Sequence, residues 1–191
     1  MAAVNSTMVE LSSNAPEFNL TDTRDGQFVS LAQAQDKPVL MMFICNHCPY
    51  VIHIIEPLVE IANQAKKSGF FVVAISANDV ENYPQDSPEN MSKFAKQYGF
   101  EFPYLFDEDQ SVAKAYKAAC TPDFYVYDQH HKLRYRGQMD SARPNNQQSV
   151  SGDDLCNALS AVKAGIAVDE PQLPSIGCNI KWKPGNQPDY F

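Results

Sequence analysis

Two cysteines with two residues between them, Cys45 and Cys48, are the residues of this chain best suited to chemistry. They stand in the segment FICNHCPYV (43–51), between an apolar run and a proline. A thiolate is a nucleophile, a metal ligand and one half of a disulfide. The pair is therefore compatible with a redox couple, a zinc clamp or two inert buried thiols, and the elements that position the sulfurs must distinguish these.

The pair lies at the junction between a predicted strand and a predicted helix. PVLMMFI (38–44) is an apolar run typical of a strand buried on both faces. The periodicity from Pro49 to Lys67 predicts a helix, kinked at Pro57, with Val51, Ile52, Ile55, Val59 and Ala62 on its buried face. FFVVAIS (70–76) predicts a second strand, parallel to the first because a helix connects them.

This placement favours redox chemistry. Unpaired N–H groups and the helix dipole stabilise a thiolate at the start of a helix. We expect Cys45 to be the more exposed sulfur, with a lowered pKa, and to attack an incoming disulfide. Cys48 shares the buried helix face and would then attack the mixed disulfide. His47 would offer a donor or a partial positive charge to the Cys45 thiolate.

The remaining elements complete one α/β domain. They are a helix from about residue 88 to 98 capped by Asp86 or Ser87, a strand at 102–106, a short helix around 110–118, a hairpin of 123–128 with 133–139, and a final helix capped by Ser151. We expect a domain over residues 1–168 and a tail over 169–191 that packs on it without regular structure.

Composition excludes several classes of function. The 191 residues include 15 Lys+Arg against 23 Asp+Glu, a net charge of −8, which repels nucleic acid and anionic lipid. The longest apolar runs are too short to span a bilayer, and we recognise no secretory signal. Five cysteines, an odd number, make a poor disulfide framework and favour a reducing, cytoplasmic location.

A zinc clamp is the weaker interpretation of the cysteine pair. Zinc needs two further ligands, and the chain has no second CxxC. Disulfide exchange needs no cofactor or metal, and we expect none. Its partners would be a protein or small-molecule disulfide or peroxide and a thiol reductant, with the protein itself a monomer or a homodimer.

Four segments together resemble a known family. They are APEFNLTDTRDGQFVSL (15–31), CNHCPYV (45–51), Thr121–Pro122 before a strand, and GCNIKWKPG (177–185). The chain resembles the AhpC/TSA-redoxin branch of the thioredoxin superfamily over roughly residues 8 to 185, and within it a peroxiredoxin-like group. The resemblance implies a thioredoxin-like three-layer α/β/α fold with an N-terminal extension and inserted helices. It also implies a cis-Pro122 facing the CxxC, with the Thr121 backbone accepting an extended substrate.

The chain departs from both the peroxidase and the thioredoxin patterns. Peroxiredoxins of this branch carry P-x-x-x-T-x-x-C, but Met41 and Cys45 replace the proline and the threonine before Cys48. Arg136 or Arg143 would have to supply the peroxide-binding guanidinium. Thioredoxins bury an acidic residue where this chain has Val39, so a water or Glu56 would have to accept the proton. We rank thiol–disulfide exchange first, peroxide reduction second and copper or zinc binding third.

Two other cysteines have open roles. Cys120, two residues before Pro122, is predicted to lie close to the CxxC, either as a third redox thiol or intermolecular disulfide site, or as a small packing residue. Cys178 in the tail could resolve a disulfide if the tail folds back over the site. We favour the alternative, in which Cys178 anchors the tail together with Ile180 and Trp182.

Overall fold

The structure, a computed structural model, describes residues 3–190 and contains a central mixed β-sheet. Within these residues the sheet has seven strands in the order β3-β2-β6-β5-β4-β8-β9. Their bounds are β2 (Asn19–Asp22), β3 (Phe28–Ser30), β4 (Val39–Phe43), β5 (Phe71–Ser76), β6 (Tyr104–Phe106), β8 (Asp123–Tyr127) and β9 (Leu133–Gly137). β5 runs parallel to β4 and β6, as expected of a β-α-β unit, and β8 and β9 form the predicted antiparallel hairpin.

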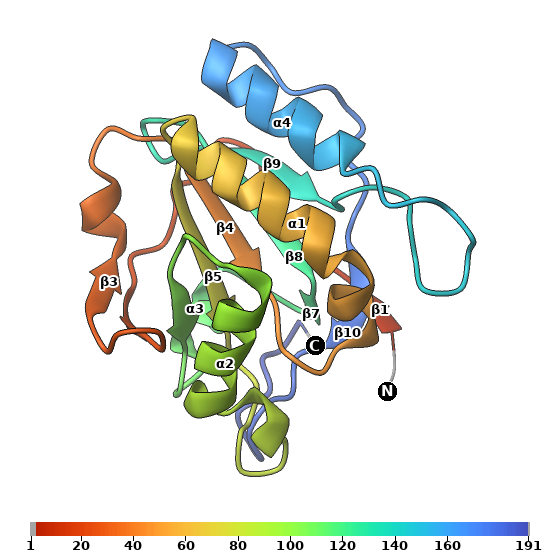
Figure 1. Cartoon of the computed structure of the whole chain (residues 1–191). Coiled ribbons are helices and arrows are strands. Elements are labelled where there is room, and N and C mark those ends of the chain that lie inside the picture. The colour runs from red at the N-terminus through yellow and green to blue at the C-terminus, as the bar shows by residue number, and fades with distance from the viewer. Residues whose placement is uncertain (1–2, 191) are drawn as a thin grey trace.

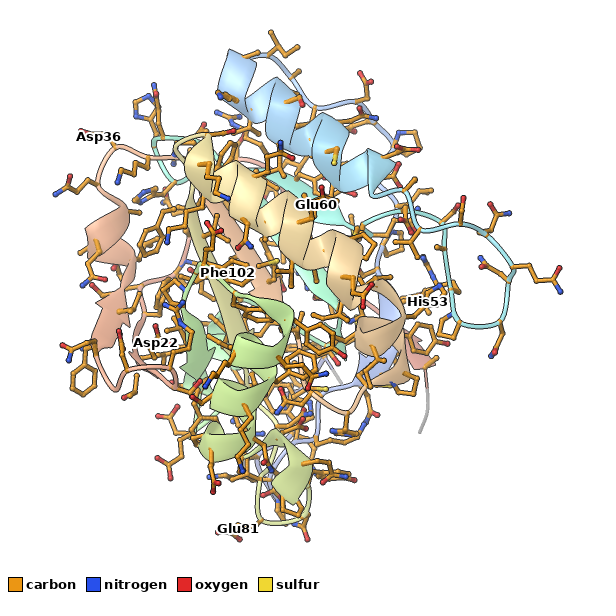
Figure 2. All side chains as sticks on the ribbon, in the orientation of Figure 1. Asp22, Asp36, His53, Glu60, Glu81 and Phe102 are labelled. Carbon is orange, nitrogen blue, oxygen red and sulfur yellow. The ribbon has the colours of Figure 1, made fainter. Side chains whose placement is uncertain are left out.

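Helices cover both faces of this sheet, so the three-layer architecture is confirmed (Figure 1). One face carries α1 (Pro49–Lys67), α2 (Pro88–Tyr98) and α4 (Asp153–Ala164). The other face carries the short helix α3 (Ser111–Ala115) and the 3-10 turn η1 (Leu31–Ala34). A second 3-10 turn, η2 (Pro84–Asp86), ends the loop between β5 and α2, and Glu81 marks the far end of that loop in Figure 2.

Strand β4 is the centre of the core because its side chains alternate between two apolar layers. Leu40 and Met42 pack under α1, whereas Met41 and Phe43 pack on the opposite face. All four are fully buried. A strand covered on both faces requires an unbroken apolar run, which is why this strand was predictable from the sequence.

Helix α1 begins and ends where predicted, but its buried face differs in part. Cys48 is its N-cap, and Lys66 and Lys67 lie in its last turn. Ile52, predicted to be buried, is 48% exposed, while Ile54 is buried in its place. The apolar stripe of α1 is therefore rotated from the predicted one. The N-cap of α4 is Gly152 instead of the predicted Ser151.

The C-terminal tail contains a strand, contrary to the prediction that it lacks regular structure. Strand β10 (Ile176–Asn179) lies between β1 (Ala3–Asn5) and β7 (Cys120–Thr121), antiparallel to both. Figure 1 shows these strands beside the N-terminus of α1. The physical reason is Gly177, since a Cβ at this position would overlap the Thr121 carbonyl oxygen. Only glycine lets the tail approach β7 so closely.

The tail is fixed on both sides of β10. Before the strand, Ser175 donates from its hydroxyl to Gly137 O (2.7 Å) and from its backbone N–H to the Ser6 hydroxyl (3.0 Å). After it, Lys181 donates its backbone N–H to Asn78 Oδ1 (2.8 Å) and accepts from the Asp79 N–H (2.8 Å). The tail is thus an integral part of the fold. No helix among residues 3–190 is long and apolar enough to cross a membrane.

Gly177→Ala should destabilise the protein by about 2 kcal/mol, the usual cost of overpacking a close contact. The added methyl meets backbone atoms of Thr121, which cannot rotate away. Gly185→Ala, in the same tail, is the matched control. It has open space and a φ of +76°, so it should cost about 1 kcal/mol of backbone strain. Urea unfolding measures both, and a Gly177→Ala loss no larger than the control would contradict the close packing.

Candidate redox site

The two sulfurs of the CxxC meet at the place where β4 passes into α1. Cys45 follows the end of β4, and Cys48 caps α1, its carbonyl accepting the first helical hydrogen bond from Ile52 (2.9 Å). The Cys45 and Cys48 side chains are close enough to change each other's pKa. Both also contact Thr121, through its hydroxyl for Cys45 (3.4 Å) and through its carbonyl for Cys48 (3.2 Å). The sulfurs are therefore positioned for a reversible disulfide.

Both cysteines are buried, so Cys45, predicted to be the more exposed of the two, exceeds Cys48 only marginally. Cys45 is 1% exposed and Cys48 is 0% exposed. Both belong to the apolar core beneath α1, together with Cys178. A reaction partner can reach Cys45 only after a local displacement of the segments that cover it.

The environment stabilises negative charge on Cys48. Hydrogen bonds from the Cys178 and Cys45 thiols are the main cause, and together they hold the pKa of Cys48 well below its usual value despite burial. Thr121 and the backbone N–H of Val51 add to this effect. The physical basis is a thiolate at the N-terminus of a helix with thiol donors on two sides.

The pKa of Cys45 shifts in the opposite direction, which contradicts the predicted low value. Its hydrogen bond to Cys48, burial and the carboxylate of Asp86 all raise the pKa, and the Thr121 hydroxyl opposes them only in part. The reason is positional: Cys48, not Cys45, is the residue that caps the helix. In the reduced pair, negative charge is therefore favoured on Cys48 over Cys45.

His47 is held by Asp86, a buried carboxylate that sequence reasoning did not identify as a site residue. His47 Nδ1 lies 2.6 Å from Asp86 Oδ2, and the ring stacks on Tyr83 with centroids 5.6 Å apart. Asp86 also accepts hydrogen bonds from the Asn46 N–H (2.8 Å) and from Asn78 Nδ2 (2.8 Å). Asp86 is fully buried by these partners.

Asp86 is therefore a buried carboxylate beside the cysteine pair, whereas the strand position expected to carry one holds Val39. Glu56, the predicted substitute, is exposed. The only sequence signal for Asp86 was its position at the end of a polar loop before a helix, where a cap is expected. Ser87 performs that capping by accepting from the Asn90 N–H (3.4 Å). Asp86 instead points to the segment between the two cysteines.

Three donor atoms at the site have the chemistry of a metal site. The Cys45 sulfur, a His47 ring nitrogen and an Asp86 oxygen all lie within 4.8 Å of one another. Sulfur, nitrogen and oxygen ligands suit zinc. Both Asp86 oxygens, however, are already engaged by protein groups, Oδ1 by the Asn46 N–H and Oδ2 by His47. Cys48 is not one of these three donors, and its sulfur interacts with Thr121 and Cys178 instead.

The Thr121–Pro122 peptide bond is cis, as the resemblance implied, but its edge is not free for an extended substrate. β10 already pairs with β7, placing Cys178 opposite Thr121 and Asn179 opposite Cys120. The predicted strand-like binding of a substrate at Thr121 is therefore wrong for this conformation, because the chain's own tail occupies that position.

The arginines proposed for peroxide binding are engaged elsewhere. Arg136 is fully buried, pairs with Asp123 (3.0 Å) and lies over the Tyr125 ring (4.4 Å). Arg143 donates to the carbonyls of Asp140 (2.7 Å) and Ala142 (2.6 Å). No hydrogen bond or ion pair among residues 3–190 connects either guanidinium to Cys45 or Cys48.

Cys120 is a buried neighbour of the site and not a surface thiol. It is 0% exposed, so an intermolecular disulfide at this position would need a local displacement of the segments that cover it. Burial and the nearby Asp123 raise its pKa, which keeps it protonated. Its thiol contacts the Pro122 carbonyl at 3.7 Å, consistent with the packing role that was one of its two predicted alternatives.

A three-layer α/β/α fold with a CxxC at a strand-to-helix junction opposite a cis-proline defines a protein of the thioredoxin-like class. The sequence pattern of the AhpC/TSA family matches residues 11–136. The chain belongs to the AhpC/TSA family.

Solved structures extend this similarity to the whole chain. An uncharacterised conserved protein of Geobacillus kaustophilus is 53% identical with a TM-score of 0.94, covering 97% of this chain and 98% of that one. A hypothetical protein of Sinorhizobium meliloti 1021 is 46% identical with a TM-score of 0.92, covering 95% and 99%. The thiol-disulfide oxidoreductase ResA of Geobacillus kaustophilus is 27% identical over 128 residues, 67% of this chain and 69% of that protein.

Variants in which one of the two cysteines is replaced by serine should separate the ionisation of Cys45 from that of Cys48 in a pH titration. The titration is followed by thiolate absorbance near 240 nm. In Cys45→Ser the remaining Cys48 should already be a thiolate at neutral pH, so its absorbance stays nearly constant from pH 6 to 9. In Cys48→Ser, Cys45 should stay protonated over that range, because burial and Asp86 disfavour its charge. The reverse order of ionisation would contradict the site described above.

Asp86→Asn, introduced into Cys48→Ser, should lower the Cys45 pKa by about one unit, since a nearby negative charge is removed without changing the shape of the side chain. Glu81→Gln is the matched control, because Glu81 lies exposed in the same loop (Figure 2). It should leave the titration unchanged. Equal shifts in both variants would show that general charge, and not the buried Asp86, acts on Cys45.

Proposed function

We propose that this protein is a thiol–disulfide oxidoreductase that uses Cys45 and Cys48 as its redox pair. The observation that carries the proposal is the pair of cysteines at the N-terminus of α1, whose sulfurs both contact Thr121 of the cis-proline segment. The ResA relatives, named thiol-disulfide oxidoreductases, support the same activity.

The geometry suggests how the two sulfurs divide the reaction. Cys45 attacks one sulfur of a substrate disulfide, forming a mixed disulfide, and its proton leaves with the first thiol product. Cys48, already a thiolate, then attacks the Cys45 sulfur, which closes the Cys45–Cys48 disulfide and expels the second product as a thiolate. The low pKa of Cys48 favours this second step, because it needs no proton acceptor.

Asp86 and His47 would act on the first step. Their buried pair lies beside Cys45, and Asp86 raises the Cys45 pKa. This arrangement keeps Cys45 protonated until a substrate arrives and gives its proton a nearby acceptor. His47 is therefore a positioning residue for Cys45, linked to it through Asp86, in place of the direct thiolate stabiliser expected from the sequence.

The proposal extends to the family group, the substrates and the location of the protein. Assignment to the peroxiredoxin-like group with CxHCPYV and GCxIKWKPG is proposed from the segments CNHCPYV (45–51) and GCNIKWKPG (177–185) of this chain. The substrates proposed are protein or small-molecule disulfides, with a thiol system as electron donor. A cytoplasmic location is proposed from the cysteine content alone.

Peroxide reduction and metal binding are the two alternative activities that the experiments below distinguish from disulfide exchange. Peroxide reduction is disfavoured because Met41 and Cys45 replace two peroxide-positioning residues and both candidate arginines are engaged elsewhere. Metal binding is favoured by one observation, the Cys45, His47 and Asp86 donor cluster. Stoichiometric zinc or copper after purification under reducing conditions, lost in His47→Asn, would support metal binding over disulfide exchange.

Insulin-disulfide reduction with dithiothreitol as donor tests the proposed function. Cys45→Ser and Cys48→Ser should each lose roughly 90% or more of the protein-dependent rate, because Cys45 makes the first attack on the substrate and Cys48 releases the product. Cys156→Ser, which alters a thiol on α4 outside the site, is the matched control and should retain the rate. Fast hydrogen peroxide consumption that survives in Cys45→Ser would instead identify Cys48 as a peroxidatic sulfur and overturn the proposal.

A further inference from the structure

The tail cysteine Cys178 lies at the redox site and not on the surface. β10 places it directly opposite Thr121, the residue that both redox sulfurs contact. Cys178 is only 4% exposed and belongs to the same apolar cluster as Cys45 and Cys48. The tail is hydrogen-bonded before and after β10, so this position is fixed by the fold.

Three sulfurs are consequently connected in a row. Cys178 lies opposite Thr121, whose carbonyl is 3.2 Å from the Cys48 sulfur and whose hydroxyl is 3.4 Å from the Cys45 sulfur. The pKa of Cys48 responds to both of the other cysteines. Cys48 is the central sulfur and has a potential disulfide partner on each side. One partner comes from the loop before α1 and the other from the tail.

We propose that Cys178 is a third redox thiol, which takes over Cys48 from the Cys45–Cys48 disulfide to form a Cys48–Cys178 disulfide. This inference rests on the proposed function, since the first disulfide is formed by the substrate. Cys178 is then a catalytic residue of the same site, and the anchoring role preferred from the sequence is only part of its function.

The bonds, protons and electrons of this exchange balance among the three cysteines of the chain. The Cys178 sulfur, as a thiolate, attacks the Cys48 sulfur of the closed disulfide. The Cys45–Cys48 bond breaks, a Cys48–Cys178 bond forms, and Cys45 leaves as a thiolate that takes up the proton Cys178 has lost. No electrons enter or leave, so the step needs no oxidant beyond the disulfide substrate of the first turnover.

Groups around Cys178 are suited to its becoming an attacking thiolate. The positive charge of Lys181 and the backbone N–H of Tyr50 both favour the charged form of Cys178. In the reduced protein the Cys48 thiolate opposes this by accepting the Cys178 hydrogen bond. That opposition disappears once Cys48 is in a disulfide, and burial is then the remaining cause that raises the pKa of Cys178 against Lys181 and the Tyr50 N–H. Cys178 is therefore easier to ionise at the stage at which it attacks.

The consequence is a transfer of the disulfide from the β4–α1 junction to the tail. Cys45 is released as a thiol while oxidation is held between α1 and β10. The same disulfide would tie the tail covalently over β7, the strand that β10 already pairs with.

Disulfide mapping of full-length protein tests this inference. The protein is oxidised with oxidised glutathione, remaining thiols are blocked with N-ethylmaleimide under denaturing conditions, and trypsin is added. Cys45 and Cys48 share the tryptic peptide 25–66, Cys178 lies in 164–181, Cys120 in 118–132 and Cys156 in 137–163. A Cys48–Cys178 disulfide therefore joins two otherwise separate peptides.

We expect the peptides 25–66 and 164–181 to be linked in a fraction of wild-type molecules and in most molecules of Cys45→Ser. Cys45→Ser/Cys156→Ser, the matched control, should keep the link. Cys45→Ser/Cys178→Ser should lose it and carry glutathione on Cys48 instead. Cys178→Ala, with folding checked by circular dichroism, should still close Cys45–Cys48.

Quantitative blocking of Cys178 by N-ethylmaleimide in both the wild type and Cys45→Ser would overturn the inference, provided Cys45–Cys48 closes in the wild type. Failure of the proposed function gives a different result, in which Cys45–Cys48 does not close even in Cys178→Ala.

Discussion

The structure depends on one constraint: a thiolate must be stable at the N-terminus of α1 although it is fully buried. Burial alone would keep Cys48 protonated, and the carbonyl of Thr121 offers it no positive charge. The compensation comes from thiol donors on two sides and from the start of the helix. The apolar strand β4, the N-cap position of Cys48 and the docking of the tail all serve to bring these donors to one sulfur.

The tail is the feature that sets this site apart from an open CxxC. By pairing with β7, β10 fills the edge beside the cis-proline and brings Cys178 to Cys48. It also connects to the loop that carries Asp86, because Lys181 donates to Asn78 and Asn78 donates to Asp86. The position of the tail is therefore connected by hydrogen bonds to Asp86, the carboxylate beside Cys45.

Much of the fold could be predicted from the sequence, because local signals agreed with the tertiary structure. β4 and β5 are unbroken apolar runs, α1 begins at Pro49, and α2 ends at Gly99 in a left-handed conformation. The prediction failed where contacts between distant parts of the chain determine the local structure. Ile176–Asn179 has no strand signal of its own and forms β10 only because Gly177 permits close pairing with a segment more than fifty residues away. At the site, the pair Cys45–Cys48 could be predicted from the spacing of the two cysteines in the sequence. The charge division between the two sulfurs depends on Asp86 and Cys178, which approach from distant parts of the chain.

The most direct test of the central claim is an equilibrium redox titration of the wild-type protein in dithiothreitol buffers, with thiols trapped and counted at each potential. The account predicts that Cys48 and one partner sulfur oxidise together in a single two-electron transition, and that Cys48→Ser abolishes the transition altogether. Persistence of a two-electron transition in Cys48→Ser, or oxidation of the wild type only to mixed disulfides with the buffer, would contradict the account.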